Sequence, residues 1–417
     1  MPAAFLRGGT SKGIFLNKKY LPEDTKEWDP IFRGMIGSPD ASGRQLNGMG
    51  GGISSLSKIC VVGLPDPPAG GKSSEVDSVD VEYTFIQVGV KDGVLDTSGN
   101  CGNLSTAIGV FALDEGICRV PSLESYGEHK YQGREEPDDG IKRCKATLKL
   151  LNKNTGKTIR TSFPVNKKTG LAVLGDPEIA TPGVPGQHSR ITLEILNPAG
   201  AGTGKLLPTG RPTDAVRLDG GGRIKISCVD AANPTIFLML SKLNSLLLFR
   251  EIEPLPVDPK LFLKSDFPAD TLKVLEDIRK QAARMMGLDP DVQAQPKICI
   301  LRPADTPTCP FDFAAKTLSM GVLHKAIPST VALCLAAAVG TRGSEIHIAY
   351  NNIVTNGRNV GSEPQHGTGV NWQDVDVKIG IPAGIVGVNG KFEADGEVKS
   401  VTMERTARRL MRGEIYW

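Results

Sequence analysis

Alternating apolar and polar positions predict a chain built largely from short strands. In residues 80–85, Val81, Tyr83 and Phe85 fall on one face, which is typical of a strand with one buried side. The same alternation recurs in five further segments: residues 145–150, 191–195, 224–228, 345–348 and 398–403. We expect all six segments to form half-buried antiparallel strands.

Three segments have the apolar spacing of helices. Residues 271–286 carry one apolar stripe, and Asp270 is the expected N-cap. Residues 104–113 and 330–339 are apolar on nearly every side, as expected of an enclosed helix. One such helix in each half, surrounded by short strands, predicts an α+β protein of two similar domains, each a mostly antiparallel sheet or barrel wrapped around its central helix.

The length and one Gly/Pro-rich segment suggest where the two domains meet. A chain of 417 residues suggests two domains of ordinary size. The boundary is expected in residues 197–204, which follow a predicted strand. We therefore expect domains at 1–197 and 198–417, with the last strands free to pack back on the first domain. The twofold character is visible only in the pattern of elements, because no sequence repeat is apparent. Residues 67–78 and 126–142 are predicted to be exposed loops.

Composition narrows the class of protein. The net charge of +3 is too small to indicate nucleic acid or a membrane surface as a partner. No signal segment or membrane-length apolar run is visible, so we expect a cytoplasmic protein. The eight cysteines include no C-x-x-C pair, which fits a reducing compartment and argues against a disulfide framework or a zinc site.

Several catalytic motifs are incomplete. In the Gly-rich residues 200–205, a phosphate loop would need glycine at Ala199 and Ser or Thr at Leu206. A loop that donates N–H groups to a smaller anion stays open. The five histidines have no pair at helical ligand spacing, so we expect no metal site. A Ser-His-Asp hydrolase is weakly supported because no G-x-S-x-G segment is present.

Lys58 and Cys101 form the most informative pair. Cys101 lies between Gly99-Asn100 and Gly102-Asn103, directly before a predicted helix, where backbone N–H groups favour an anion and tune a thiol. Lys58 ends a Gly/Ser-rich loop and enters an apolar strand. Partial burial would lower its pKa from about 10.4 towards the 7–8 useful for a general base. Such a pair can take a proton from one carbon and return it to another.

At these residues the chain resembles the 2-methylaconitate cis-trans isomerase family, whose members are related to diaminopimelate epimerase. The matching stretches span the chain: residues 7–13, 50–58, 99–103, 204–210, 230–234, 319–325 and 405–410. The resemblance implies two epimerase-like domains, a small polycarboxylate substrate such as 2-methylaconitate, 3-methylitaconate, 4-oxalomesaconate or aconitate, and neither metal nor organic cofactor. The family's catalytic lysine and cysteine fall on Lys58 and Cys101.

Two departures from the family pattern bear on the substrate and the chemistry. A His-Pro-Ser-Gly stretch of many members reads Ile-Pro-Ala-Gly at residues 381–384, which leaves the substrate open. Epimerases use two opposed cysteines, whereas the second apolar helix offers only Cys334, well inside its apolar stretch. A two-thiol racemase is therefore disfavoured.

The expected reaction is a cofactor-free 1,3-proton shift or cis-trans isomerisation, with Lys58 as base and Cys101 as acid. The expected binding shell comprises Thr10, Ser11, Ser54, Asn100, Gly102, Asn103, Ser319 and, through its backbone, Met320. The helix end favours thiolate whereas proton delivery needs thiol, so the two roles are open to reversal. Two alternatives remain: a single-carbon epimerase, and a non-catalytic carboxylate-binding partner of an aconitase-like dehydratase. The sequence also leaves open whether the chain is a homo-oligomer.

Overall fold

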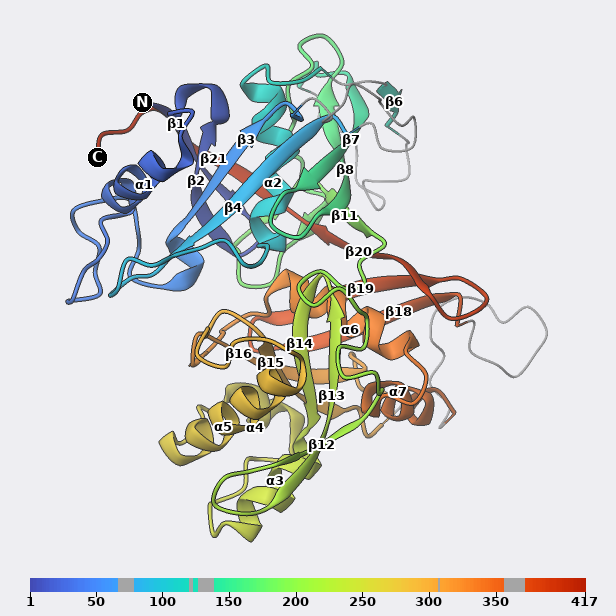
Figure 1. Ribbon diagram of the computed structural model, residues 1–417. Coiled ribbons are helices and arrows are strands. Elements are labelled where there is room, and N and C mark those ends of the chain that lie inside the picture. The colour runs from blue at the N-terminus through green and yellow to red at the C-terminus, as the bar shows by residue number, and fades with distance from the viewer. Residues whose placement is uncertain (67–78, 120–122, 127–138, 307, 356–371) are drawn as a thin grey trace. The chain divides into compact units, whose positions relative to one another are not determined.

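A computed structural model describes residues 1–417 except 67–78, 120–122, 127–138, 307 and 356–371 (Figure 1). The predicted loop at 67–78, most of the one at 126–142, and two of the histidines, His129 and His366, lie outside the described residues. The chain divides into two compact units. Unit 1 comprises Met1–Ile195 and Glu404–Trp417, and unit 2 comprises Leu196–Met403.

The described residues of unit 1 form a mixed sheet, a separate two-stranded sheet, two α-helices and short 3-10 turns. Its helices are α1 (Trp28–Ile36) and α2 (Gly102–Asp114), and the 3-10 turns are Lys18–Tyr20, Thr25–Glu27 and Ser54–Leu56. Its strands are β1 (Pro2–Gly8), β2 (Ser11–Asn17), β3 (Lys58–Gly63), β4 (Val81–Val88), β5 (Leu95–Asp96), β6 (Leu123–Ser125), β7 (Arg143–Asn152), β8 (Lys157–Asn166), β9 (Ile179–Ala180), β10 (Gln187–His188), β11 (Ile191–Leu196) and β21 (Ala407–Glu414). Strands β1, β2, β3, β4, β7, β8 and β11 pair successively, and β2–β3 and β4–β7 are the parallel pairs.

Unit 2 repeats this order of pairings. Its helices are α3 (Leu240–Phe249), α4 (Pro259–Lys264), α5 (Ala269–Met285), α6 (Ser329–Gly340) and α7 (Glu345–Thr355). Its strands are β12 (Asp214–Arg217), β13 (Arg223–Ala231), β14 (Asn233–Met239), β15 (Lys297–Pro303), β16 (Phe313–Ser319), β17 (Val322–Leu323), β18 (Asp374–Ile381), β19 (Gly384–Phe392) and β20 (Val398–Arg405), the last of which continues into unit 1. Strands β13, β14, β15, β16, β18, β19 and β20 pair successively, again with the second and fourth pairings parallel.

Each unit buries one apolar helix against its own strands. In unit 1, α2 contacts β1, β2, β3, β4, β7 and β21 (Figure 1). In unit 2, α6 contacts β13, β14, β18 and β19. Every α6 residue, and every α2 residue except the last, is buried. A helix without a polar face is stable only in such an enclosure.

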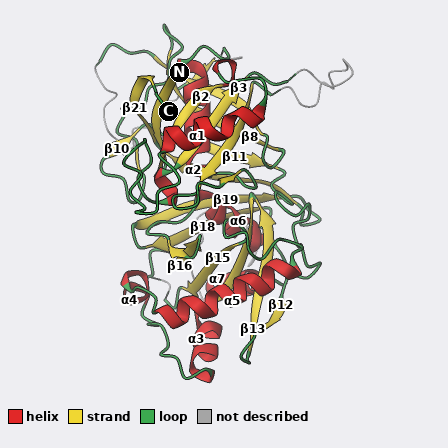
Figure 2. Cartoon of the chain, turned by 60° about the vertical axis from the view of Figure 1, so that its left-hand side comes forward, coloured by secondary structure: helices red, strands yellow, loops and turns green. Residues whose placement is uncertain are grey.

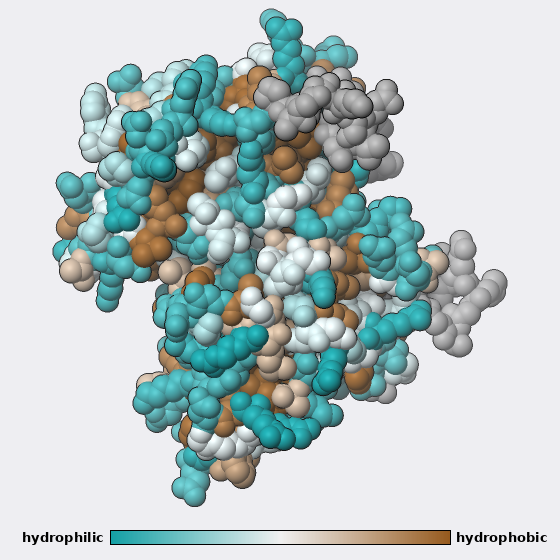
Figure 3. Space-filling model, in the orientation of Figure 1, coloured by the Kyte–Doolittle hydropathy of each residue, from teal (hydrophilic) through white to brown (hydrophobic). Residues whose placement is uncertain are grey.

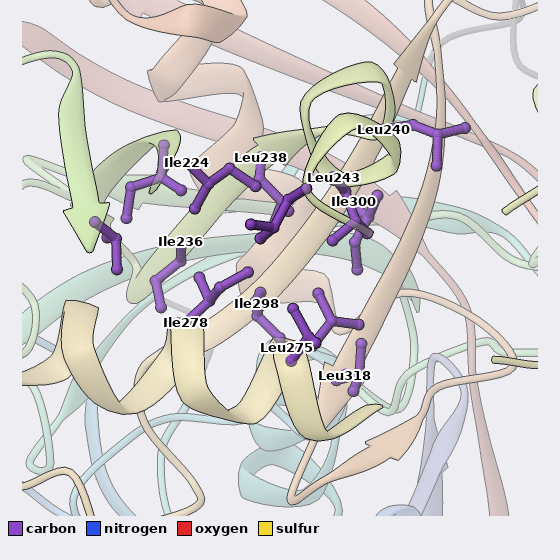
Figure 4. Packing of buried hydrophobic residues seen from close by; sticks show 14 of the residues in the cluster. Ile224, Ile236, Leu238, Leu240, Leu243, Leu275, Ile278, Ile298, Ile300 and Leu318 are labelled. Atoms are coloured by element: carbon purple, nitrogen blue, oxygen red, sulfur yellow. The ribbon is translucent and has the colours of Figure 1, made fainter. Parts of the chain in front are cut away.

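The opposite face of each sheet is covered by amphipathic helices. In unit 1, Phe32 and Met35 of α1 pack on Ile59 and Val61 of β3. In unit 2, α5 lies across β12 and β15 (Figure 2). Its apolar stripe packs on strand residues that include Ile298 (Figure 4). A strand covered on both sides is buried along its whole length, and every residue of β3, including Lys58, is buried.

Most of the predicted elements are confirmed, including α2, α5, α6 and five of the six strands. The predicted N-cap of α5 is wrong, because the helix begins at Ala269 after Pro268 and Asp270 lies in its first turn. The strand predicted at 345–348 is wrong, because these residues begin α7. Four residues are too few to separate the two periodicities, and Ile346 is buried together with Tyr350 and Ile353 at helical spacing. The mixture of mainly antiparallel sheets and helices confirms the α+β class.

Hydrophilic residues are spread over the visible face of each unit, with smaller hydrophobic areas between them (Figure 3). Among the described residues, no helix is both long and apolar enough to cross a membrane.

Candidate functional site

Lys58 is the first residue of β3 and projects from its α2-facing side. The intervening residues Ile59 and Val61 belong to the apolar cluster on the other side of the sheet, and successive side chains of a strand alternate between faces. The side chain of Lys58 is held by β4. Its Nζ donates a hydrogen bond to Gln87 Oε1 and lies 4.9 Å from the centroid of the Phe85 ring.

The amine of Lys58 is desolvated but has a neutral hydrogen-bond partner. The residue is only 8% exposed. Within the described part of the chain, no carboxylate forms an ion pair with it. The hydrogen-bond partner of the buried amine is therefore the neutral amide of Gln87.

Cys101 is the N-cap residue of α2 and is half-buried. Its Sγ lies 4.0 Å from Ser11 Oγ, and its carbonyl accepts the first intrahelical bond from Ser105 N at 2.9 Å. The N–H groups of Gly102 and Asn103 therefore precede the hydrogen-bonded part of the helix. Together with the helix dipole they create a positive end beside the thiol, where a negative charge is stabilised.

The turn between β1 and β2 packs directly on this helix end. Thr10 Oγ1 accepts a hydrogen bond from Asn103 Nδ2 at 3.2 Å. Gly9 has a φ of +49°, and a Cβ placed on it would lie 2.2 Å from Asn103 Oδ1. A Cβ on Gly8 would lie 2.3 Å from the Asn103 carbonyl oxygen. Both glycines are needed because the backbone of the turn touches the helix.

A buried network holds Asn100 beneath the start of the helix. Tyr83 Oη donates to Asn100 Oδ1 at 3.0 Å and lies 2.8 Å from Ser105 Oγ. Ser105 Oγ also lies 3.2 Å from Asn100 Oδ1. Burial raises the pKa of Tyr83, so its phenol stays a neutral donor. The residue before Cys101 is thus fixed by β4.

Cys60 lies on the strand that begins with Lys58. It is fully buried on β3, two residues after Lys58. Burial raises the pKa of its thiol, Cys101 raises it further, and Lys58 lowers it. The start of β3 lies against the first turn of α2, because a Cβ placed on Gly13 would lie 2.8 Å from both Lys58 O and Leu104 Cδ1.

The structure brings most, but not all, of the predicted site residues together. Those in unit 1 gather around the start of α2 and the start of β3: Thr10, Ser11, Ser54, Lys58, Asn100, Cys101, Gly102 and Asn103. Ser319 and Met320 belong to unit 2. Ser319 ends β16, where its Oγ accepts a hydrogen bond from Lys297 Nζ at 3.0 Å. Met320 has a φ of +53° in the turn that follows.

The sequence did not predict that Gln87 contacts Lys58 or that Tyr83 holds Asn100. Both continue the inward face of β4 that Val81 and Phe85 define. A glutamine at a buried position of an apolar face was the available signal, because a buried amide must find hydrogen-bond partners. Among the described residues, no group of three or more His, Cys, Asp or Glu side chains is arranged to hold a metal ion.

Comparison with known proteins assigns the family. The profile of the PrpF protein family matches residues 1–417. The chain belongs to the PrpF protein family. Its relatives include 3-methylitaconate isomerase of Eubacterium barkeri, 31% identical, with 100% of this chain and 97% of that protein covered. Another PrpF relative is 2-methyl-aconitate isomerase of Cupriavidus necator, 30% identical over 100% of this chain and 96% of that protein.

A solved structure agrees with this assignment to the PrpF family. The crystal structure of methylitaconate-delta-isomerase matches with a TM-score of 0.67 and 30% identity, covering 99% of this chain and 94% of that one. The predicted membership of the 2-methylaconitate isomerase family is confirmed.

Proposed function

We propose that this chain is a cofactor-independent isomerase of small unsaturated di- or tricarboxylates. It moves a double bond by a 1,3-proton shift, or interconverts cis and trans isomers through the same intermediate. Relatives that match along the whole chain are named as isomerases of methylitaconate and methylaconitate, which supports the reaction class. Incubation with several unsaturated acids identifies the one that this chain isomerises.

The observation that carries the proposal is the pairing of one amine with one helix-terminal thiol. The start of β3 at Lys58 lies against the first turn of α2, since a Cβ placed on Gly13 would lie 2.8 Å from both Lys58 O and Leu104 Cδ1. Lys58 is the first residue of a strand, and Cys101 is the N-cap of a helix. Two chemically different groups suit removal of a proton at one carbon and delivery at another.

The reaction begins at the carbon made acidic by a neighbouring C=C–COO⁻ group. Lys58 takes its proton and becomes an ammonium, and the electron pair spreads into a dienolate. The Cys101 thiol then protonates the far carbon, so that the double bond has moved by one position. Lys58 then releases its extra proton to water, and the Cys101 thiolate takes up a proton from water. Both groups thereby return to their starting states. The reverse reaction exchanges the two roles.

The start of α2 would stabilise the dienolate. The N–H groups of Gly102 and Asn103 are fixed in the helix before any substrate binds, and preorganised donors stabilise developing negative charge most effectively. Hydroxyl and amide groups around them would hold the substrate carboxylates. The proposed binding shell in unit 1 is Thr10, Ser11, Ser54, Asn100, Gly102 and Asn103. Ser319 and the backbone of Met320, in unit 2, stay predictions from the sequence.

The repeated order of strand pairings supports a further proposal about the architecture. We propose that each unit is a diaminopimelate-epimerase-like domain, with a boundary close to residue 197. We also propose a cytoplasmic location, because the eight cysteines are spread along the sequence without a C-x-x-C pair, a pattern that fits a reducing compartment.

The test is incubation of the protein in D₂O with cis-aconitate, 2-methylaconitate, methylitaconate and oxalomesaconate, followed by NMR. We expect a shifted or isomerised double bond in at least one acid, with deuterium at the exchanged carbon. Deuterium uptake at one carbon without a moved double bond would instead indicate an epimerase. If aconitate stabilises the protein against heat but no acid is turned over, a carboxylate-binding accessory protein is the better description.

A further inference from the structure

Gln87 is the cross-strand partner of Lys58 in the antiparallel pair β3–β4. It is 7% exposed, and its Oε1 accepts the hydrogen bond from the Lys58 amine. Directly opposed residues in an antiparallel pair have side chains close enough to interact wherever the sheet is formed. The amine of Lys58 therefore has a fixed partner that belongs to the sheet.

The orientation of the Gln87 amide is determined by its other end. Nε2 donates to the carbonyl oxygens of Ser57 at 3.0 Å and Ser54 at 3.2 Å. A rotated amide would place Oε1 against these two carbonyls and its NH₂ group against the amine of Lys58, losing every one of these bonds. Oε1 consequently faces Lys58, and the same amide fixes the turn that leads into β3.

Gln87 also lies between Lys58 and an acidic residue. On its other side, β4 pairs with β5, where the partner of Gln87 is Asp96. Other titratable groups described on this side of the sheet are the thiols of Cys60 and Cys101 and the phenol of Tyr83. Burial raises the pKa values of Cys60 and Tyr83, so both stay neutral near neutral pH, and Cys101 is the proposed acid. A neutral amide thus separates the amine from the nearest carboxylate in its cross-strand row.

We propose that Gln87 is a positioning residue that holds Lys58 through a neutral oxygen and so keeps its amine able to exchange a proton. A carbonyl oxygen accepts a hydrogen bond from either an ammonium or a free amine. A carboxylate at the same place would stabilise the ammonium and hold Lys58 in its charged form. This inference rests on the proposed role of Lys58 in proton transfer.

Two substitutions move the titration of Lys58 in opposite directions. Gln87→Glu places a negative charge against the amine, so the limb of the pH–rate profile that reports Lys58 should move up by about one to three pH units. Gln87→Met removes the acceptor and leaves the amine desolvated, so the same limb should move down. The direction holds whether Lys58 acts as base or as acid. NMR titration of protein labelled at lysine Nζ, with the Lys58 signal assigned by its loss in Lys58→Ala, reads the same shifts without substrate.

Gln45→Met is the matched control. Gln45 is 1% exposed and also holds the turn before β3, accepting from Gly52 N at 2.8 Å and Ser57 Oγ at 2.7 Å. It has no bond to Lys58, so its loss should weaken the fold and leave the pH limb in place. If both Gln87 variants keep the wild-type limb and NMR titration, Gln87 is only structural and the inference fails. If the wild type turns over none of the acids, the proposed function fails, while the NMR titration still decides the role of Gln87.

Discussion

The corresponding strands β3 and β15 of the two units begin with the same three residues but hold their lysines in different surroundings. β3 begins Lys58-Ile59-Cys60 and β15 begins Lys297-Ile298-Cys299. Each strand is parallel to the strand before it and antiparallel to the strand after it, and both cysteines are fully buried. The shared Lys-Ile-Cys is too short to appear as a repeat in the sequence, and the correspondence of the two strands is visible only in the order of pairings.

The surroundings of the two lysines differ. Lys58 is buried and its amine contacts the Gln87 amide, whereas Lys297 is half-buried and its amine donates to the Ser319 hydroxyl. The central helices differ as well, since α2 follows Cys101 and α6 follows Pro328. The comparison teaches that the shared scaffold supplies a lysine twice but supplies a helix-terminal thiol once, in unit 1.

Replacing each of the two lysines separately by alanine should give the largest difference in kcat between the units. Lys58→Ala removes the proposed proton-transfer group, so kcat should fall by about 10²–10⁴-fold while the fold is retained. Lys297→Ala removes a half-buried charge, and we expect a change in kcat/KM of no more than about tenfold, mostly in KM. Steady-state kinetics and circular dichroism of both variants decide this. Equal losses of kcat would show that the two lysines are not functionally distinct.

Two cysteines provide the next contrast. Cys101→Ser replaces a thiol by a much weaker acid, so kcat should fall by on the order of 10²-fold. Cys334 is fully buried in α6, its Sγ donates to Val229 O at 3.4 Å, and burial raises the pKa of its thiol. Cys334→Ser should therefore cost about 1 kcal/mol of unfolding free energy and leave kcat unchanged. A large loss of kcat in Cys334→Ser, measured below its melting temperature, would revive a two-thiol mechanism.

The turn between β1 and β2 can be compared in the same way with the turn between β13 and β14. Gly9 and Ala232 both have left-handed backbones, with φ of +49° and +65°. Gly9→Ala would drive a Cβ into Asn103, and we expect a loss of about 1–3 kcal/mol in unfolding free energy together with reduced turnover. Ala232→Gly relieves a strained conformation and should be neutral or stabilising by up to about 1 kcal/mol. Denaturant titrations measure both, and a Gly9→Ala variant with wild-type stability and activity would contradict the close fit of the turn.

The sequence was informative where a residue's own neighbours determine its environment. The two enclosed helices follow from apolar residues on every side, and Cys101 at a helix start follows from the flanking Gly and Asn residues. Gln87 could not be assigned in this way, because its function depends on the register between β3 and β4, which residues far apart in the chain set together. The strand prediction for residues 345–348 was wrong for a related reason. Tyr350 and Ile353 lie beyond this short segment, and their burial together with Ile346 favours a helix.

Two buried tyrosines give the smallest and most selective contrast. Tyr83 in unit 1 donates to Asn100, and Tyr350 in unit 2 donates to the carbonyl oxygen of Asp376 at 2.8 Å. Replacing either by phenylalanine removes one hydroxyl from a buried ring, so each should cost about 0.5–1.5 kcal/mol in unfolding free energy. Only Tyr83→Phe should also lower kcat, by a few-fold, because Asn100 directly precedes Cys101 and would lose the donor that fixes it. Thermal unfolding and turnover measured on the same samples separate the two effects. Equal losses of stability with equal kcat would mean that the network beneath α2 supports the fold alone.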